Sequence, residues 1–276
     1  MTAAEGSLVV KDLRVEFDGF VAVDGVSFDA HPGEVRFLIG PNGAGKTTCI
    51  DAITGLSRGS GSVTLGDQEL LGTSTQKIVR LGVGRTFQTA SVFEQLSVLQ
   101  NLDIAAGLHR SSLSLLRARR GVEPAIELAL EETGLNNERE TPAGILSHGQ
   151  KQWLEIGMML VQEPRALLLD EPVAGMSQDE RTATGELLQR IARRRIVLVV
   201  EHDMDFMRRY ASRVTVLHQG KLLSEGTVAQ VQADPKVQEV YLGTAGATTT
   251  AAMLVVADTA IEAKTAVTDA ASQGGA

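Results

Sequence analysis

The sequence predicts an α/β fold in which an N-terminal antiparallel β subdomain precedes a mostly parallel core, with a helical subdomain inserted into that core. Residues 8–30 alternate apolar and polar side chains between Asp-Gly turns, which is typical of antiparallel strands. Continuous apolar runs at Val35–Ile39, Ala166–Leu169 and Ile196–Val200 are typical of strands covered on both faces. Residues 97–145 instead carry apolar side chains at helical spacing, interrupted by Gly and Pro.

Length and composition restrict the class of protein. The 276 residues allow one large α/β domain or two small ones. Cys49 is the one cysteine, which excludes an internal disulfide framework, and we expect it to be a packed side chain rather than a redox group. The net charge of −8 argues against a nucleic-acid surface. Residues 1–6 lack the features of a signal peptide and no apolar run is long enough to span a bilayer, so we expect a cytoplasmic protein.

The first motif follows the apolar run Val35–Ile39 and opens a segment that resembles a helix. It reads Gly-Pro-Asn-Gly-Ala-Gly-Lys-Thr-Thr and fits the pattern G-x-x-x-x-G-K-[ST] of a phosphate-binding loop, as in P-loop NTPases. Its glycines let the backbone turn sharply and approach an anion, its lysine reaches the β- and γ-phosphates, and Thr47 is placed for Mg²⁺. The predicted nucleotide-binding residues here are Gly40, Pro41, Asn42, Gly43, Ala44, Gly45, Lys46, Thr47 and Thr48.

A second motif ends the apolar run Ala166–Leu169 with two acids, Asp170 and Glu171. A carboxylate at the end of such a strand can hold Mg²⁺, and the next acid can poise an attacking water. Apolar runs that end in Asp-Glu are also common at ordinary strand-to-loop junctions. Beside a phosphate-binding loop the functional interpretation is favoured, because phosphoryl transfer needs a metal and a residue that positions water. We therefore predict Asp170 as a metal ligand and Glu171 as catalytic.

The third motif, Leu146-Ser-His-Gly-Gln150, resembles the signature of the ATP-binding cassette (ABC) family, which is Leu-Ser-Gly-Gly-Gln or a near relative at the start of a helix. Ser147, Gly149 and Gln150 are therefore predicted to bind nucleotide, since a hydroxyl and free N–H groups at a helix N-terminus form an anion site. The alternative is an ordinary serine N-cap followed by core residues. His148 departs from the family pattern, which usually has glycine there.

Other positions match the same family in order and spacing. The resemblance implies that Phe17 stacks on adenine, with a buried strand residue as the alternative, and that Gln88 links Mg²⁺ and the attacking water to the membrane-facing surface. It also implies that His202 contacts the γ-phosphate. The predicted catalytic residues are thus Glu171, His202 and Gln88, and the predicted metal ligands are Thr47, Gln88 and Asp170. Where the family usually has an aspartate in the loop after the catalytic glutamate, this chain has Ser177, which supplies no fixed charge.

The resemblance covers residues 7–243, a predicted ATPase domain with a helical subdomain at about 97–161. Residues 244–276 are rich in Ala and Thr and form a predicted flexible tail. Three rival classes fit less well. A DNA-maintenance ATPase would carry a long coiled coil in the insert, a translation-type cassette protein would carry two cassettes, and a metabolic P-loop kinase would lack Leu146–Gln150.

Within the family, the sequence is most similar to the ATP-binding subunit of bacterial urea importers, a subgroup of the branched-chain amino-acid importers. The motifs that carry this similarity include Val200-Glu-His-Asp-Met204 and Glu239-Val-Tyr-Leu-Gly243. The resemblance implies a head-to-tail pair of cassettes that binds two ATP molecules with Mg²⁺ at the inner face of the membrane. It also implies membrane permease subunits as partners and indirectly an extracytoplasmic solute-binding protein. Phe93 and Leu96 are the candidate apolar contacts with the permease, and the alternative is that they only pack the helical insert. Urea is the predicted solute, with a branched-chain amino acid or short-chain amide as the alternative.

Overall fold

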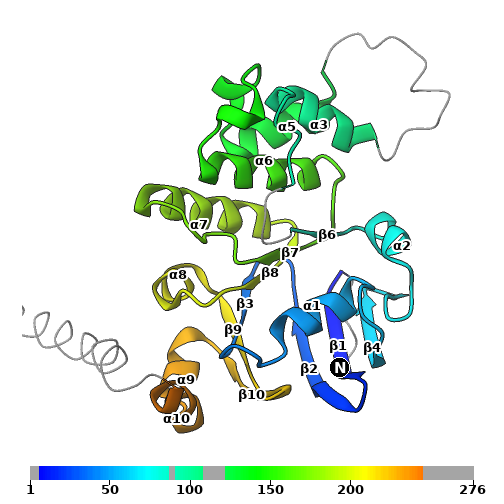
Figure 1. The fold of residues 1–276 in the computed structure, drawn as a ribbon, viewed down its shortest axis with the longest axis vertical. Coiled ribbons are helices and arrows are strands. Elements are labelled where there is room, and N and C mark those ends of the chain that lie inside the picture. Colours follow the sequence, from blue (N-terminus) through cyan, green and yellow to red (C-terminus); the bar gives the residue numbers. More distant parts are fainter. Residues whose placement is uncertain (1–5, 87–90, 108–121, 245–276) are drawn as a thin grey trace, which may run out of the picture. The chain divides into compact units, whose positions relative to one another are not determined.

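The computed structural model describes residues 6–86, 91–107 and 122–244. Its first sheet is antiparallel with the strand order β2-β1-β4-β5 (Figure 1). The strands are β1 (Leu8–Phe17), β2 (Phe20–Ala30), β4 (Ser60–Leu65) and β5 (Gln68–Glu69). Residues 8–30 therefore form the antiparallel pair that their alternation predicts. The buried side chains of β1 are Leu8, Val10, Leu13 and Val15, and the remaining side chains of this strand are partly or fully exposed.

The second sheet has six strands in the order β10-β9-β3-β8-β7-β6. Its strands are β3 (Val35–Ile39), β6 (Val83–Arg85), β7 (Ala166–Asp170), β8 (Ile196–Val200), β9 (Arg213–His218) and β10 (Lys221–Gly226). All neighbours pair in parallel except β9 and β10. Every residue of β3, β7 and β8 is buried, which explains why these strands are almost entirely apolar. The exceptions are Asp170, which ends β7, and Arg36, which interrupts the predicted apolar run in β3 and forms ion pairs with Glu34 and Glu225. Because β8 pairs with both β3 and β7, the carboxyl ends of these three strands meet at one edge.

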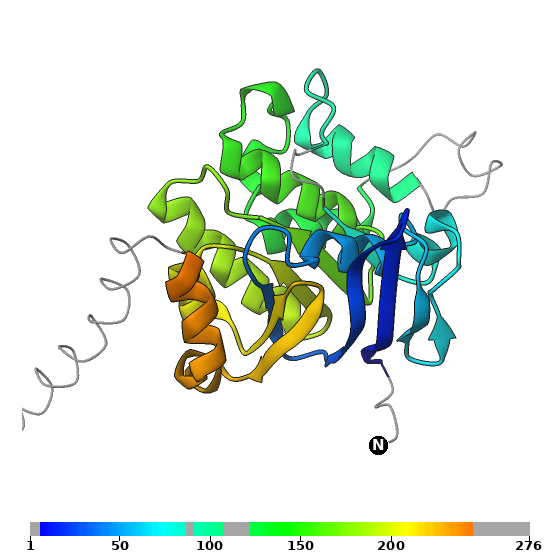
Figure 2. The same cartoon turned by 60° about the horizontal axis from the view of Figure 1, so that its bottom comes forward.

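Some helices lie near the two sheets, and others form a helical region whose sequence lies between those of β6 and β7 (Figures 1 and 2). Near the sheets are α1 (Lys46–Ile53), α2 (Thr75–Arg80), α7 (Gln178–Ala192) and α8 (Met204–Tyr210). The helical region consists of α3 (Val98–Ala106), α5 (Pro124–Thr133), the short 3₁₀ helices Asn136–Glu138 and Ala143–Ile145, and α6 (His148–Leu160). The predicted fold class is confirmed.

The predicted helix breakers mark the ends of these helices. Pro124 is the first residue of α5. The first N–H groups of a helix have no acceptor within the helix, so the lack of an N–H in proline costs nothing there. Gly134 ends the same helix in the left-handed region, with φ 74°. Ser97 begins α3 with a capping box, in which its side chain accepts from the N–H of Gln100 and the Gln100 side chain accepts from the N–H of Ser97.

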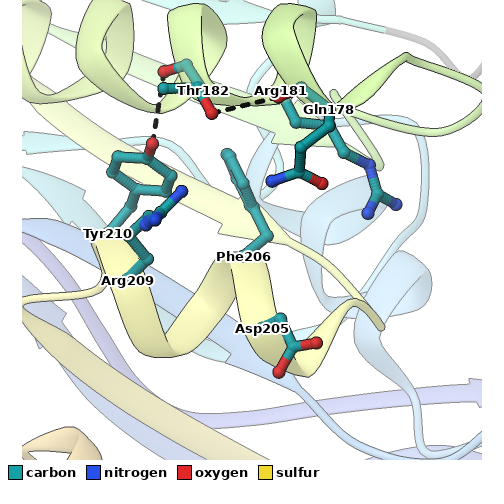
Figure 3. A pocket seen from close by; sticks show the side chains of 7 residues that line it. All are labelled: Gln178, Arg181, Thr182, Asp205, Phe206, Arg209 and Tyr210. Carbon is teal, nitrogen blue, oxygen red and sulfur yellow. Dashed lines mark hydrogen bonds between the residues drawn. The ribbon is translucent and has the colours of Figure 1, made fainter.

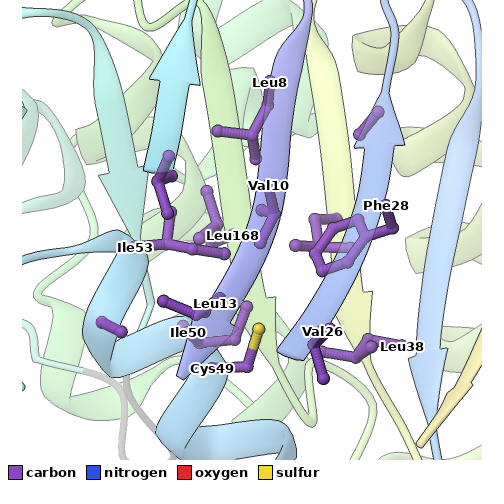
Figure 4. Close-up of a cluster of buried hydrophobic side chains, with 14 of the residues drawn as sticks. Leu8, Val10, Leu13, Val26, Phe28, Leu38, Cys49, Ile50, Ile53 and Leu168 are labelled. Carbon is purple, nitrogen blue, oxygen red and sulfur yellow. The ribbon is translucent and has the colours of Figure 1, made fainter. Parts of the chain in front are cut away.

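A shared apolar core joins the two sheets through α1 (Figure 4). Leu8, Val10 and Leu13 of β1 pack in one buried cluster with Ile50 and Ile53 of α1 and with Leu168 of β7. Cys49 belongs to this cluster, and burial raises the pKa of its thiol to about 12. The prediction that Cys49 is a packed side chain is therefore confirmed. The core fixes the start of α1, and hence the loop before it, against both sheets.

The chain separates into two compact units after Val231. The second unit is described as far as Thr244 and contains the end of α9 (Val228–Ala233) and α10 (Pro235–Thr244). Within it, the side-chain amide of Gln238 donates to the carbonyl oxygen of Gln232 at 2.8 Å. The predicted tail lies outside the described residues except for Thr244. None of the helices described is both long enough and apolar enough to cross a membrane.

Candidate functional site

The predicted phosphate-binding loop connects β3 to α1 and depends on its glycines. Gly40, Gly43 and Gly45 have φ values of 153°, 77° and 96°. A Cβ at Gly40 would lie 2.2 Å from the carbonyl oxygen of Leu217 in β9, and one at Gly45 would lie 2.6 Å from that of Ala22 in β2. Side chains at these two positions would therefore push the loop away from both sheets.

Lys46, the first residue of α1, folds back over this loop. Its ammonium group donates to the carbonyl oxygens of Gly40 at 2.8 Å and Pro41 at 3.1 Å. Burial lowers the pKa of Lys46, and the negative charges of Glu171 and Asp170 oppose that shift. The ammonium group of the lysine thus binds the carbonyl oxygens of the loop and is close enough to the two acids for their charges to affect its pKa.

The carboxyl ends of β7 and β8 bring two of the predicted catalytic residues together. Glu171 follows β7 with φ 51°, a conformation that is uncommon for a residue other than glycine, and its N–H donates to the carbonyl oxygen of Val200 at 2.9 Å. One of its carboxylate oxygens, Oε1, lies 3.4 Å from Nδ1 of His202, which follows β8. The His202 side chain is 65% exposed, so both groups are accessible from solvent.

Asp170 ends β7 and is suited to hold a cation. It is 3% exposed, and its Oδ1 atom has no hydrogen-bond partner among the described residues. Burial raises the pKa of Asp170, whereas Arg85, whose guanidinium lies 3.8 Å from Oδ2, opposes that rise. Arg85 also forms an ion pair with Asp51 of α1. A buried carboxylate oxygen without a partner fits Mg²⁺, which uses one or two carboxylates together with phosphate oxygens and water.

Glu201 was not predicted as a site residue, yet its hydrogen bonds connect the loop after β7 to the loop after β8. Its buried carboxylate accepts from the N–H groups of Val173 at 3.3 Å, His202 at 3.1 Å and Asp203 at 3.3 Å. Burial raises its pKa, and these backbone hydrogen bonds oppose the shift. The position of Glu201 between β8 and His202 is the only sequence signal for this role.

The signature-like motif forms the start of α6. Ser147 is the N-cap and forms a capping box with Gln150, so the alternative interpretation as a helix cap is correct as far as local structure goes. The Ser147 hydroxyl donates to Oε1 of Glu180 at 2.7 Å, and the N–H of Gly149 donates to the same oxygen at 3.3 Å. Nε2 of His148 lies 3.1 Å from the carbonyl oxygen of Ala174. The motif therefore lies directly against the segment between β7 and α7.

The remaining predicted residues lie elsewhere. Phe17 ends β1 and is 47% exposed, so its alternative assignment as a buried strand residue is wrong, and its pairing partner Phe20 is exposed too. Gln88 lies outside the described residues. Phe93 is exposed and Leu96 is partly buried. Ser177 is the N-cap of α7, and its hydroxyl donates to Oε2 of Glu180 at 2.8 Å.

A polar pocket of about 300 Å³ lies between α7 and α8 (Figure 3). Gln178, Arg181 and Phe206 are among the residues that line it. Arg181 forms an ion pair with Asp203, the N-cap of α8, at 2.6 Å. None of the predicted nucleotide-binding residues lines the pocket.

No group of three or more His, Cys, Asp or Glu side chains that could hold a metal ion occurs in the part of the chain that the structure describes. The hydroxyl of Thr47 on α1 and the carboxylate of Asp170 are the candidate Mg²⁺ ligands, and phosphate oxygens and water complete such sites.

Known protein families match the chain in two places. The family model described as ABC transporter matches residues 23–174, more than half of the chain. A second model, described as Branched-chain amino acid ATP-binding cassette transporter, matches residues 221–247.

Similar proteins and structures agree with these matches. The high-affinity branched-chain amino acid transport ATP-binding protein LivG of Escherichia coli (strain K12) is 36% identical over an alignment of 250 residues, and the match covers 86% of this chain and 98% of LivG. The similarly named BraF of Pseudomonas aeruginosa is also 36% identical, over 86% of this chain and 98% of BraF. The crystal structure of the ADP conformation of MJ1267, an ATP-binding cassette of an ABC transporter, superposes with a TM-score of 0.75 at 29% identity and covers 87% of this chain and 100% of MJ1267.

Proposed function

The chain belongs to the ATP-binding cassette family of transporter ATPases, and from this premise we propose that it powers the uptake of a small polar solute through membrane permease subunits. One observation carries the assignment of the catalytic residues. Glu171 and His202 approach within 3.4 Å at the sheet edge where the phosphate-binding loop leaves β3. In open α/β sheets, ligands bind at the carboxyl ends of the strands.

The roles follow from charge and position. Lys46 binds the β- and γ-phosphates once it exchanges the carbonyl oxygens of Gly40 and Pro41 for phosphate oxygens. Glu171 polarises the attacking water, and His202 contacts the γ-phosphate beside it. The exposed ring of Phe17 stacks on the adenine.

The fit of the residues supports Mg²⁺ as the metal. Thr47 and Asp170 would hold it, together with Gln88 as inferred from the sequence. Bound Mg²⁺ neutralises charge on the phosphate oxygens during phosphoryl transfer. The positive charge of Arg85 favours the ionised form of Asp170, because it opposes the rise in the carboxyl pKa that burial causes.

We propose that two cassettes bind ATP between them. Ser147, Gly149 and Gln150 form a helix N-terminus that suits the γ-phosphate. None of the hydrogen bonds described joins this motif to the phosphate-binding loop of the same chain, and Ser147 is exposed. The motif is therefore available to an ATP molecule held by the phosphate-binding loop of a second cassette, either a copy of this chain or a sister protein.

The partners would follow from this arrangement. The exposed Phe93, with Leu96 beside it, provides apolar surface for a cytoplasmic segment of the permease. The buried side chain of Asn101 holds this segment in place, because its amide donates to the carbonyl oxygens of Phe93 and Leu96. The cassette would thus lie on the inner face of the membrane, and an extracytoplasmic binding protein would deliver the solute to the permease.

For the solute, the relatives support a branched-chain amino acid more than urea. LivG and BraF are both named as branched-chain amino acid transport proteins, and the match at residues 221–247 carries the same description. Urea, predicted from short motifs, remains the second candidate because those motifs resemble the urea subgroup.

The test is reconstitution with the membrane partners. The cassette is co-purified with its permease subunits and solute-binding protein, and ATP hydrolysis is measured with leucine, with urea and with neither. We expect stimulation by leucine and not by urea. Stimulation by urea alone would reverse the choice of solute, and a cassette that copurifies with no permease subunit would contradict the transport role.

A further inference from the structure

Glu180, in the first turn of α7, joins the signature motif to the loop that precedes α7. Its Oε1 atom accepts hydrogen bonds from the Ser147 hydroxyl at 2.7 Å and from the N–H of Gly149 at 3.3 Å. Its Oε2 atom accepts from the N–H of Ser177 at 3.0 Å and from the Ser177 hydroxyl at 2.8 Å. One carboxylate therefore receives four hydrogen bonds from two separate segments.

The surroundings hold this carboxylate in its ionised form. The hydrogen bond from Ser147, followed by those from Ser177, lowers the pKa of Glu180 to about 2. The packing around it is also close, because a Cβ added to Gly149 would lie 2.6 Å from Oε1. A glycine at position 149 thus allows a negative charge to reach the start of α6, where the free N–H groups favour an anion.

A nucleotide phosphate would need the same groups. The Ser147 hydroxyl has a single hydrogen, which it donates to Glu180, while its oxygen accepts from the N–H of Gln150 at 3.1 Å. Donation to a phosphate oxygen requires that hydrogen. Two neighbouring anions at one helix N-terminus also repel each other. The carboxylate and a γ-phosphate therefore compete for Ser147.

We propose that Glu180 is a positioning residue that acts as the resident anion of the signature motif in the separate subunit. It holds Ser147 and Gly149 in place and releases the Ser147 hydroxyl when the ATP of a second cassette arrives. Oε2 of Glu180 stays hydrogen-bonded to Ser177. When Glu180 releases Ser147 and moves, the contacts of Ser177 in the loop before α7 therefore change as well. This inference rests on the proposed head-to-tail pair of cassettes.

Replacement of Glu180 by glutamine tests the competition directly. Glutamine completes the capping boxes at Gln100 and Gln150 in this same chain, so Glu180→Gln preserves the cap at Ser177. With its oxygen toward the N–H of Ser177, the new amide group faces Ser147 and donates to the serine oxygen. The serine hydrogen is then free for a phosphate, and the negative charge is gone.

The experiment compares dimer formation in the Glu171→Gln background, which is expected to bind ATP without turning it over. ATP and Mg²⁺ are titrated while dimer is measured by light scattering. We expect the Glu171→Gln/Glu180→Gln protein to dimerise at an ATP concentration about two- to tenfold lower than Glu171→Gln alone, since one unfavourable charge at a helix N-terminus is removed. ATP affinity of the separate subunits is measured first, so that dimer formation is compared at equal occupancy.

Glu186→Gln is the matched control, because Glu186 is exposed on the same helix and the change in net charge is identical. It should leave the ATP requirement of the Glu171→Gln dimer unchanged. An equal shift in this control would mean that net charge alone acts, and the inference would be wrong. It would also be wrong if Glu180→Gln left the ATP requirement unchanged or raised it.

Two further outcomes separate the possible failures. If Glu180→Gln does not melt cooperatively, Glu180→Ala, which keeps Ser177 as the cap, must shift the ATP requirement in the same direction. If Glu171→Gln itself binds ATP yet forms no dimer, the proposed pair of cassettes is overturned and this inference with it. A normal Glu171→Gln dimer that is insensitive to Glu180 overturns the inference alone.

Discussion

Nδ1 of His202 lies 3.4 Å from Oε1 of Glu171, although 30 residues of sequence separate the two. The parallel pairing of β7 with β8 produces this contact, because Asp170 is opposite Val200 and each of the two residues proposed as catalytic follows its strand. Glu201 then fixes the backbone of both loops through three N–H groups. The sheet therefore determines the distance between the Glu171 carboxylate and the His202 imidazole.

The first prediction concerns Glu171. Glu171→Gln should retain ATP binding and lower the hydrolysis rate by about 10²-fold or more, since the amide can hydrogen-bond water but cannot act as a general base. The measurement is steady-state phosphate release, with ATP binding followed separately. Glu163→Gln, at another residue with positive φ and outside the site, is the control. Near-normal hydrolysis by Glu171→Gln would assign the catalytic role to another residue.

The second prediction concerns Lys46. Lys46→Ala should abolish hydrolysis and weaken ATP binding, because the ammonium is the main fixed positive charge at the β- and γ-phosphates. The substitution also removes the hydrogen bonds to Gly40 and Pro41, so thermal melting must be recorded to verify the fold. Lys77→Ala, at an exposed lysine of α2, should behave as wild type. Hydrolysis within a few-fold of wild type would contradict the phosphate-binding assignment.

The third prediction is a pH effect at Arg85. Burial raises the pKa of Asp170 and Arg85 opposes that rise, so Arg85→Ala should raise the pKa further, and the negative charge of Asp51 adds to this shift. Asp170 would then become protonated at higher pH and lose its capacity to bind Mg²⁺. The acidic limb of the pH profile of Mg²⁺-dependent hydrolysis should therefore move to higher pH.

Two variants control for this effect. Arg85→Lys keeps the positive charge and should restore much of the original acidic limb. Arg80→Ala removes an exposed arginine from α2 and should not change the profile. An unchanged limb in Arg85→Ala would show that Arg85 does not control the ionisation of Asp170.

Short-range signals in the sequence predicted much of the fold and of the site. Alternation predicted the pair β1 and β2, and continuous apolar runs predicted the buried strands β3, β7 and β8. The phosphate-binding loop was also predictable, because its glycines are required by local backbone geometry and appear at fixed spacing.

Contacts between distant segments could not be predicted in the same way. Glu180 gives one local signal, the pattern Ser177-x-x-Glu180 of a capping box, and nothing in that pattern indicates Ser147, 33 residues earlier. Arg85 likewise meets Asp51 and Asp170 only because β6 pairs with β7 beside α1. Side-chain pairing across elements depends on the packing of the whole domain, and periodicity does not encode it.

The fourth prediction concerns the C-terminal tail. Truncation after Gly243 should leave the melting temperature within about 2 °C of wild type and the ATPase rate nearly unchanged, because the tail sequence lacks a patterned apolar face that could dock firmly. Differential scanning calorimetry and phosphate release provide the measurements. A fall of many degrees would show that the apolar patch Met253–Val256 is buried in the native protein.

The last prediction tests whether the active unit combines two subunits. Ser147→Arg places a bulky cation at the start of α6 and removes the hydroxyl, while the phosphate-binding loop of the same chain is untouched. In a head-to-tail pair this variant should bind ATP with near-normal affinity yet fail to hydrolyse it. Lys46→Ala should fail for the opposite reason, since its signature motif is intact and its phosphate-binding loop is not.

A mixture of these two inactive proteins separates a shared site from independent sites. In a mixed pair one interface carries both defects, whereas the other combines the intact loop of the Ser147→Arg subunit with the intact signature motif of the Lys46→Ala subunit. ATP hydrolysis should therefore reappear in the mixture although neither parent is active. Independent subunits could not recover activity in any ratio. If mixed pairs form, as verified by differently tagged subunits, and remain inactive, the two sites either are not shared or must both be intact for turnover. Covalently linked pairs in which only one subunit carries Ser147→Arg distinguish these cases. Independent subunits would leave such a pair with about half the wild-type rate, whereas shared sites that must both be intact would leave it inactive.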